Sequence, residues 1–191
     1  MHLENVVIDA VEPLVTGPEW EERLGTERLT TLPEGVETRI HLPGEAFLDL
    51  CVIAVPEAEE EPERLHLVLG PGEQGRERLE EIRLESADVP RDLAFWTWLS
   101  AWEPEAGGLR HPSGEGPLLR LVPESAPAGP LKNRAHLDMR LAPGEEPDAA
   151  AAELVRRGGR EVTEDPTLPW RVFEDPSGNV LCLLPAPAPG S

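Results

Sequence analysis

The stretch Leu118–Leu141, LLRLVPESAPAGPLKNRAHLDMRL, contains two apolar runs separated by a Pro/Gly/Ala connection and a Lys-Asn-Arg step. The second run alternates between apolar and polar side chains, with Leu137, Met139 and Leu141 on one side and His136, Asp138 and Arg140 on the other. A period of two predicts a β-strand whose apolar face covers a core and whose other face is polar.

A shorter stretch of similar sequence occurs upstream, in Cys51–Leu69, CVIAVPEAEEEPERLHLVL. Val-Pro-Glu occurs in both stretches, and Arg64-Leu65-His66 matches Arg134-Ala135-His136. Internal repeats show how a chain divides into units. We therefore expect the N-terminal residues to form a truncated copy of the unit that follows, with His66 as the counterpart of His136.

Length and charge narrow the class of protein. The chain has 191 residues, and Lys+Arg 17 against Asp+Glu 37 gives a formal net charge of −20. This charge disfavours nucleic acid and membrane surfaces as partners and favours a cationic or neutral small molecule, although solubility alone also explains it. With neither a signal-like start nor an apolar run of about 20 residues, the protein is expected to be cytoplasmic.

The first 75 residues predict the order β-α-β-β-β-β. The expected elements are a strand over Asn5–Ala10, a helix over Gly17–Leu24, a hairpin of Arg28–Leu32 and Val36–Leu42, and strands over Phe47–Val55 and Arg64–Leu69. An acidic loop, Glu57–Glu63, joins the last two strands. Arg76–Glu80 is expected to be a helical turn or a linker.

The order then restarts with an alternating strand over Glu81–Ala87. Asp88 is placed to cap a helix that reaches about Trp102, on which Phe95, Trp98, Leu99 and Trp102 form one apolar stripe that favours core packing. A second helix is expected over Pro147–Arg157, and Asp175–Asn179 predicts a tight turn. The remaining expected strands are Leu109–His111, Leu118–Val122, Arg134–Leu141, Glu161–Thr163, Trp170–Glu174 and Val180–Leu184.

Three stretches together resemble the glyoxalase/bleomycin-resistance/dioxygenase family, the vicinal-oxygen-chelate superfamily: Arg83–Trp102, Val122–Leu141 and Trp170–Leu184. Within this superfamily, the sequence is most similar to the glyoxalase-like domain branch common in actinobacteria. The resemblance implies an α+β fold, in which paired βαβββ modules curl mixed sheets around a ligand cup, often with a divalent metal. On this basis we expect a complete glyoxalase-like domain over 76–185, preceded by the truncated copy over 1–75 and followed by a disordered tail over 186–191.

The resemblance also implies positions for metal ligands. Carried over position by position, the first-strand ligand falls on Glu81, the fifth-strand ligand on His136, and the last-strand carboxylate on Cys182, where the metal pattern is broken. A guanidinium such as that of Arg120 cannot coordinate a cation. A divalent metal held by Glu81 and His136 is therefore not the favoured cofactor.

The alternation of polar and apolar residues along the strands indicates a similar cup, independently of the family resemblance. If the polar strand faces converge, charges of both signs meet in one hollow, as in a pocket for a polar ligand. Two alternatives stay open, namely an ordinary solvated sheet face and a structural His136 bonded to Asp138. The residues expected to bind a ligand are Glu81, Arg83, Glu85, Arg120, His136, Asp138, Arg140 and Trp170.

We expect a metal-independent protein that binds a small polar or cationic molecule, in the manner of drug-sequestering resistance proteins. One alternative is a lyase, isomerase or dioxygenase that uses a metal at Glu81 and His136. The other is a non-catalytic protein in which the incomplete repeat serves to form a homodimer. Cys51 and Cys182 lie in apolar runs and are expected to be buried thiols. Whether the chain is an enzyme stays open.

Overall fold

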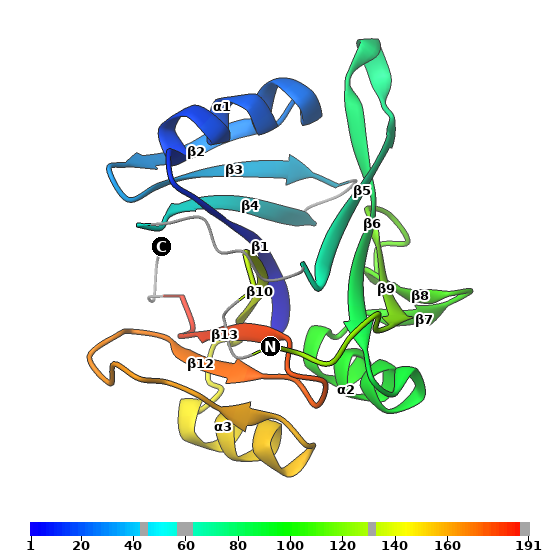
Figure 1. Cartoon of the computed structure of the whole chain (residues 1–191), viewed down its shortest axis with the longest axis vertical. Coiled ribbons are helices and arrows are strands. Elements are labelled where there is room, and N and C mark those ends of the chain that lie inside the picture. The colour runs from blue at the N-terminus through cyan, green and yellow to red at the C-terminus, as the bar shows by residue number, and fades with distance from the viewer. Residues whose placement is uncertain (43–45, 57–62, 130–132, 188–191) are drawn as a thin grey trace.

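The computed structural model describes residues 1–42, 46–56, 63–129 and 133–187, and its strands form two mixed sheets (Figure 1). The elements in chain order are β1 (His2–Ala10), α1 (Pro13–Leu24), β2 (Glu27–Leu32), β3 (Gly35–His41), β4 (Phe47–Ala54), β5 (Leu65–Pro71), a 3₁₀ turn (Glu73–Gly75), β6 (Glu77–Ser86), α2 (Val89–Ser100), β7 (Glu103–Glu105), β8 (Gly108–Arg110), β9 (Leu118–Pro123), β10 (Ala135–Arg140), α3 (Pro147–Arg156), β11 (Arg160–Glu161), β12 (Arg171–Glu174) and β13 (Val180–Leu184). The expected α+β class is confirmed.

Sheet A joins the two ends of the chain. Its strand order is β11-β12-β13-β10-β1-β4-β3-β2. The N-terminal module (β1, α1, β2–β4) and the C-terminal module (β10, α3, β11–β13) meet where β1 pairs antiparallel with β10. In each module the last strand runs parallel to the first, β4 beside β1 and β13 beside β10. Sheet A thus contains two complete βαβββ modules, joined edge to edge through the β1–β10 pair.

Sheet B contains one complete module and one extra strand. Its order is β5-β6-β9-β8-β7, in which the middle module (β6, α2, β7–β9) pairs through β6 with β5. Strand β5 takes the place beside β6 that β1 takes beside β10. The expected boundary near residue 75 separates sequence units, and strand pairing crosses that boundary in both sheets.

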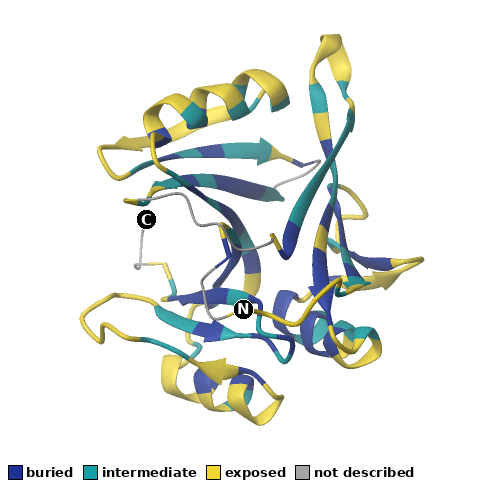
Figure 2. Ribbon diagram, in the orientation of Figure 1, coloured by how far each residue is buried: buried dark blue, intermediate teal, exposed yellow. Residues whose placement is uncertain are grey.

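Helix α2 connects the sheets. The Asp88 side chain accepts a hydrogen bond from the Arg91 amide at 3.1 Å, and the helix ends at Ala101, whose φ is 58°. It packs against β8 and β9 of sheet B and against β1 of sheet A. Its apolar side chains therefore belong to one core that both sheets share, and buried residues run through the centre of the molecule in Figure 2. Trp96, outside the expected stripe, is fully buried, whereas Trp98 is half-buried.

The tight turn between β12 and β13 is buried and polar. Asp175 accepts a hydrogen bond from Trp96 Nε1 at 3.0 Å, and Asn179 Oδ1 accepts one from Arg64 Nε at 3.0 Å. The backbone carbonyl of Ser177 also accepts from the Arg64 guanidinium. Arg64 stands at the start of β5, so this turn of sheet A is bonded to sheet B.

Some local expectations were wrong. The first helix begins at Pro13, four residues before the expected start, because Pro13 rather than Pro18 occupies the first turn. The expected turn or linker at Arg76–Glu80 belongs mainly to β6, since pairing with β5 extends this strand back to Glu77. The expected strand at Glu161–Thr163 is β11, Arg160–Glu161.

Two expectations fall largely outside the described residues. Of the acidic loop at 57–63 only residue 63 is described, and of the tail at 186–191 only residues 186 and 187. Among the described helices, none is long and apolar enough to cross a bilayer.

Candidate functional site

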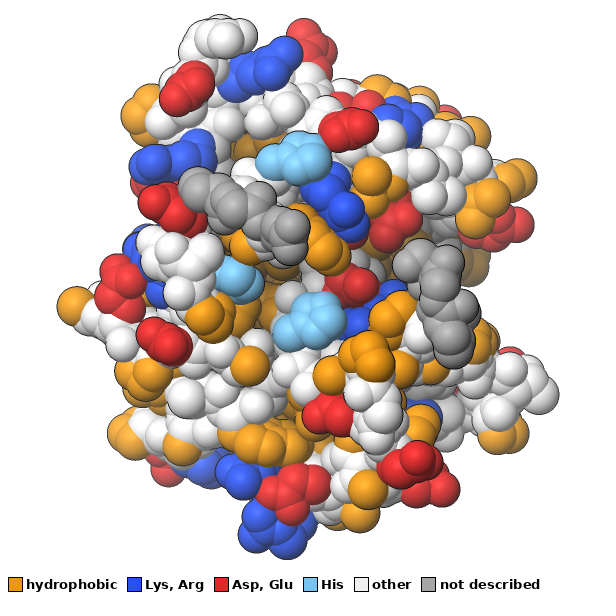
Figure 3. Space-filling model, turned by 180° about the vertical axis from the view of Figure 1, so that it is seen from behind, with side chains coloured by type: hydrophobic (Ala, Val, Ile, Leu, Met, Phe, Trp, Pro, Cys, Tyr) orange, Lys and Arg blue, Asp and Glu red, His pale blue; other side chains and the backbone are white. Residues whose placement is uncertain are grey.

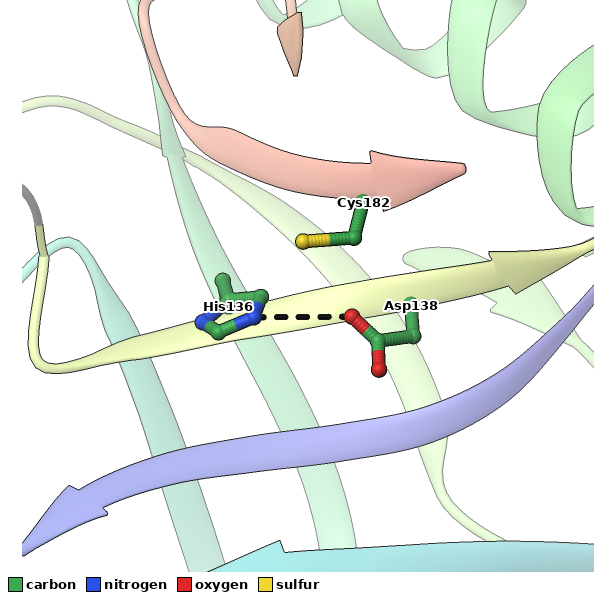
Figure 4. Close-up of side chains that lie close together, drawn as sticks. All are labelled: His136, Asp138 and Cys182. Atoms are coloured by element: carbon green, nitrogen blue, oxygen red, sulfur yellow. Dashed lines mark ion pairs between the residues drawn. The ribbon is translucent and has the colours of Figure 1, made fainter. Parts of the chain in front are cut away.

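The polar face of β10 brings together residues from three strands of sheet A. Along the register, His136 lies opposite Val7 of β1, and Asp138 lies between Asn5 of β1 and Cys182 of β13. Figure 4 shows His136, Asp138 and Cys182 pointing toward one another. His136 Nε2 lies 3.4 Å from Asp138 Oδ1, and the potential ligand atoms of these three residues all lie within 4.8 Å of one another.

This cluster is buried and incompletely hydrogen-bonded. His136 is 4 % exposed, Asp138 8 % and Asn5 6 %. Asn5 Nδ2 donates to Asp138 Oδ2 at 3.0 Å. Asn5 Oδ1, His136 Nδ1 and Asp138 Oδ1 have no hydrogen-bond partner among the described residues. Buried polar atoms nearly always have a partner, so three unpaired atoms in one cluster indicate a site for a bound group.

Further charged side chains lie on the same face, on β3 and β4. Asp49 is adjacent to Asn5 in the register and is held by two hydrogen bonds from Arg39, at 2.8 and 2.7 Å. Burial raises the pKa of the Cys51 thiol, and the carboxylates of Glu37, Asp138, Asp49 and Glu4 raise it further. The N-terminal module therefore supplies part of the site, although the sequence suggested only a packing role for it.

Glu81 lies in sheet B and belongs to a different group. It accepts hydrogen bonds from Arg120 Nη2 at 2.9 Å and from Arg83 Nε at 2.6 Å. Arg120 first, and then Arg83, lowers the pKa of the Glu81 carboxyl. The structure therefore does not bring Glu81 to His136, because β10 pairs with β1 rather than with β6.

Glu85 forms a third group. Its carboxylate accepts hydrogen bonds from Ser125 and lies 3.7 Å from Arg64 Nη1 and 3.7 Å from His66 Nε2. These contacts connect β5, β6 and the segment after β9. We interpret this group as structural, because its buried arginine also bonds the turn between β12 and β13.

The last two expected residues lie at the ends of strands of sheet A, Arg140 at the end of β10 and Trp170 just before β12. Arg140 Nε donates to Glu4 at 2.6 Å and Arg140 Nη1 donates to the Pro185 carbonyl at 2.9 Å. Trp170 lies just before β12 and is 36 % exposed. The expected ligand residues thus divide over both sheets, with His136, Asp138 and Arg140 on the polar face of β10.

The donor set at the buried cluster combines imidazole nitrogen, carboxylate oxygen and thiol sulfur, from His136, Asp138 and Cys182. Such a set suits a borderline-soft ion such as Zn²⁺ better than Mg²⁺ or Ca²⁺. The same atoms can also bind an organic cation, because unpaired amide and carboxylate oxygens accept hydrogen bonds from an ammonium group. The alternation along β10 pointed to His136 and Asp138, but no local signal in β1 pointed to Asn5.

Comparison with known proteins agrees with this fold. Among solved structures, glyoxalase I from Zea mays is similar with a TM-score of 0.56 at 11 % identity, over 96 % of this chain and 92 % of that chain. A putative dioxygenase from Bacillus subtilis gives a TM-score of 0.41 at 11 % identity, over 99 % of this chain and 63 % of that chain. No curated protein sequence matches. The glyoxalase-like domain family model matches residues 81–184, more than half of the chain. With this match and this fold, the chain belongs to the glyoxalase-like domain family, within the vicinal-oxygen-chelate superfamily.

Proposed function

We propose that the chain binds a small polar or cationic molecule on the polar face of sheet A, at Asn5, His136 and Asp138, and that it does so without a metal. The observation that carries the proposal is the set of three unpaired buried atoms there. Leaving such an atom unsatisfied costs about 1–3 kcal/mol in a folded protein. Amide and carboxylate oxygens only accept hydrogen bonds, so the bound group must be a donor.

Local charge favours a cation. Of the carboxylates around the Cys51 thiol, Asp49 is paired with Arg39 and Glu4 with Arg140. Within the described part of the chain, neither Asp138 nor Glu37 has an ion pair with an arginine. Burial, and then the charge of Asp49, raises the pKa of Glu37, which means that the surroundings disfavour its ionised form. An ammonium or amidinium group would supply both the hydrogen-bond donors and the positive charge.

The last-strand positions support binding without a metal. Thiols occupy both of them, Cys51 on β4 and Cys182 on β13. Metal sites of oxygen-preferring ions use carboxylates rather than thiols as ligands, and no carboxylate stands at either position. Glu81, the other expected ligand, is bonded to two arginines in sheet B.

The second candidate is a metal-dependent enzyme of the superfamily. A specific observation favours it, namely the close approach of His136, Asp138 and Cys182. When bound there, a divalent ion would act as a Lewis acid toward a ligand oxygen. This donor set replaces the pair Glu81 and His136 that the sequence suggested.

Calorimetric titrations and thermal unfolding with small cations test the first candidate. We would use putrescine and methylguanidine, with 1,4-butanediol as the uncharged counterpart of putrescine. At least one cation should bind saturably and raise the Tm of the wild type by mass action, whereas butanediol should not. The isosteric Asp138→Asn should abolish the effect, and Glu81→Gln in sheet B should preserve it. Absence of cation binding, or binding that persists in Asp138→Asn, would overturn the proposal.

Metal analysis separates the two candidates. After EDTA treatment, the protein would be titrated with Zn²⁺, Mn²⁺ and Ni²⁺, with His136→Gln and Cys182→Ser as variants. One tightly bound ion per chain, lost in both variants, would favour the metal-dependent enzyme. No stoichiometric binding, together with cation binding that is sensitive to Asp138→Asn, would support the metal-free protein.

A further inference from the structure

A hollow lies beside sheet B, away from the buried cluster of sheet A. It is a cavity of about 1020 Å³. Its walls come from the end of α1, the end of β3, the turn between β5 and β6, and strands β7–β9, and we call it the hairpin cavity. Both Glu81 and Arg120 line it, whereas His136 and Asp138 do not.

The cavity lies where the end of α1 and the end of β3 of the N-terminal module meet sheet B. Helix α1 packs against β6, and the Arg76 side chain lies over Gly25 at the helix end, where a Cβ atom would meet it at 2.4 Å. The walls therefore come from two modules that belong to different sheets.

We propose that the hairpin cavity binds a small organic acid, with one anionic group at Arg120 and an apolar body. Two guanidinium groups, from Arg120 and from Arg83 beside the cavity, bind the single carboxylate of Glu81, so this group of three carries one excess positive charge, although the wall as a whole has more glutamates than arginines. Arg120 Nε is buried and has no hydrogen-bond partner among the described residues. The Arg120 side chain as a whole is 32 % exposed, so a carboxylate or phosphate oxygen in the cavity would bond its guanidinium and balance the excess charge.

Other arginines on the wall are occupied, with one exception. Arg110 donates to Glu105 at 2.6 Å and to the Gly116 carbonyl, and Arg78 donates to Glu80 at 2.9 Å. Arg76 makes no ion pair with a described residue and is exposed at the rim. It can add a second, water-screened contact to the anion, weaker than that of Arg120.

The rest of the wall supplies both acidic and apolar groups. Six glutamates lie on the wall. Four of them accept hydrogen bonds from arginines, namely Glu77, Glu80, Glu81 and Glu105, and the other two, Glu73 and Glu115, are solvent-exposed, so water screens their charge. The apolar side chains that line the cavity are Leu24, Ile40, Leu42, Leu79 and Leu118. Apolar area next to one unsatisfied donor is typical of a ligand pocket, and it selects an acid with an aromatic or aliphatic body.

Two fluorescent probes of the same shape test this site. 8-Anilino-1-naphthalenesulfonate carries an anionic group, and N-phenyl-1-naphthylamine is the same body without it. The wild type should bind one molecule of the sulfonate saturably and bind the neutral probe more weakly. Arg120→Gln should weaken sulfonate binding about tenfold, as expected for a lost charge-assisted hydrogen bond, and leave the neutral probe unchanged. Arg76→Gln should have a smaller effect in the same direction.

Matched controls exclude non-specific binding. Ala106→Trp places an indole on the cavity wall and should reduce binding of both probes, whereas Ser113→Trp, outside the wall, should not. Arg156→Gln on α3 removes an exposed arginine elsewhere and should leave both affinities unchanged. Equal affinity for the two probes, or sulfonate binding that Arg120→Gln and Ala106→Trp do not alter, would overturn the proposal. His136→Gln should leave binding intact, which separates this site from the one on sheet A.

Discussion

Sheets A and B are built from the same kind of module, yet the polar faces of their central strands differ. In sheet A, β10 lies between β1 and β13, and its His136 and Asp138 are buried with unpaired atoms. In sheet B, β6 lies between β5 and β9, and its Glu81 is bonded to two arginines beside a large cavity. On the face of β10, buried polar atoms have no hydrogen-bond partner, as in a binding site without its ligand. On the face of β6, most charged side chains are already paired with one another.

The two sheets differ in their number of modules. Sheet A contains two complete modules, and His136 and Asp138 on its strand β10 are buried. Sheet B contains one module and the strand β5, and Glu81 on its strand β6 lines the hairpin cavity and forms ion pairs with Arg120 and Arg83. Figure 3 views the molecule from behind, and histidine, acidic and basic side chains gather around the middle of this view. Equivalent positions of the repeated modules thus differ in chemistry because the residues around them differ.

The largest expected effect comes from Arg64, which connects the two sheets. Arg64→Ala removes hydrogen bonds to Asn179, Ser177 and Glu124 and leaves buried carboxylates without their cation. Breaking a buried charge network in this way costs about 3–5 kcal/mol. Urea unfolding followed by tryptophan fluorescence measures the loss, and Trp96, bonded to the same turn, reports on this region.

Arg134 is the matched control, because it occupies the equivalent repeat position before β10. It is exposed, and the ion pair that it forms, with Glu63, is long at 3.9 Å. Arg134→Ala should therefore lower the free energy of unfolding by less than about 1 kcal/mol. Equal losses for the two variants would show that Arg64 does not hold the sheets together.

Two carboxylates of sheet A give the next effect, with opposite signs. Asp49 is bonded twice to Arg39, so Asp49→Asn should cost about 1.5–3 kcal/mol, the usual contribution of hydrogen bonds to a charged group. Asp138 Oδ1 makes no hydrogen bond with a described residue and only approaches His136 Nε2 at 3.4 Å, so Asp138→Asn should leave stability unchanged or raise it by about 1 kcal/mol. Thermal unfolding of the unliganded protein compares the two variants. Strong destabilisation by Asp138→Asn would mean that the cluster is structural.

The smallest effect is a contrast in pH dependence between the sheets. The pKa of Glu81 lies below 4.5 because of Arg120 and then Arg83, so its ion pairs stabilise the fold above that pH, and this stability is lost as the pH falls through the lowered pKa. The pKa of Glu37 lies above 4.5 because of burial, so the fold loses stability as the pH rises through the raised pKa.

Carboxyl titrations by NMR should therefore place Glu81 and Glu37 on opposite sides of the ordinary value. Near neutral pH, Glu81→Gln should be less stable than the wild type and Glu37→Gln more stable. Both differences should shrink in acid, where the wild-type carboxyls become protonated. The same sign for both variants would contradict the contrast between the two polar faces.

Much of the fold followed from local patterns. Alternation along Leu137–Leu141 marked the core face of β10 correctly, and the fold expected from the family resemblance is confirmed. The N-cap at Asp88 and the apolar stripe of α2 were also correct in outline. The exception on this helix is Trp96, whose indole is buried because it donates to Asp175 from a distant turn. No periodicity in a helix can reveal such a partner.

The candidate site was only partly accessible from sequence. His136 and Asp138 were identified from the polar side of one strand, and the structure places them together with Asn5 and Cys182. Glu81 has the same local signature as His136, a polar residue on the first strand of a module, yet it lies in the other sheet. The narrower actinobacterial branch and the domain boundaries stay predictions.

The sequence by itself determined most of the strands and helices and the core face of strands such as β10, because alternation and helical spacing are local properties of the chain. Only the tertiary structure decided which module stands beside which. The first strands of the modules present similar edges of backbone donors and acceptors, and pairing joins segments more than a hundred residues apart, such as β1 and β10. The sequence of one strand does not reveal which equivalent edge it will pair with. The residues that surround His136 and Glu81 are therefore decided only when the whole chain folds.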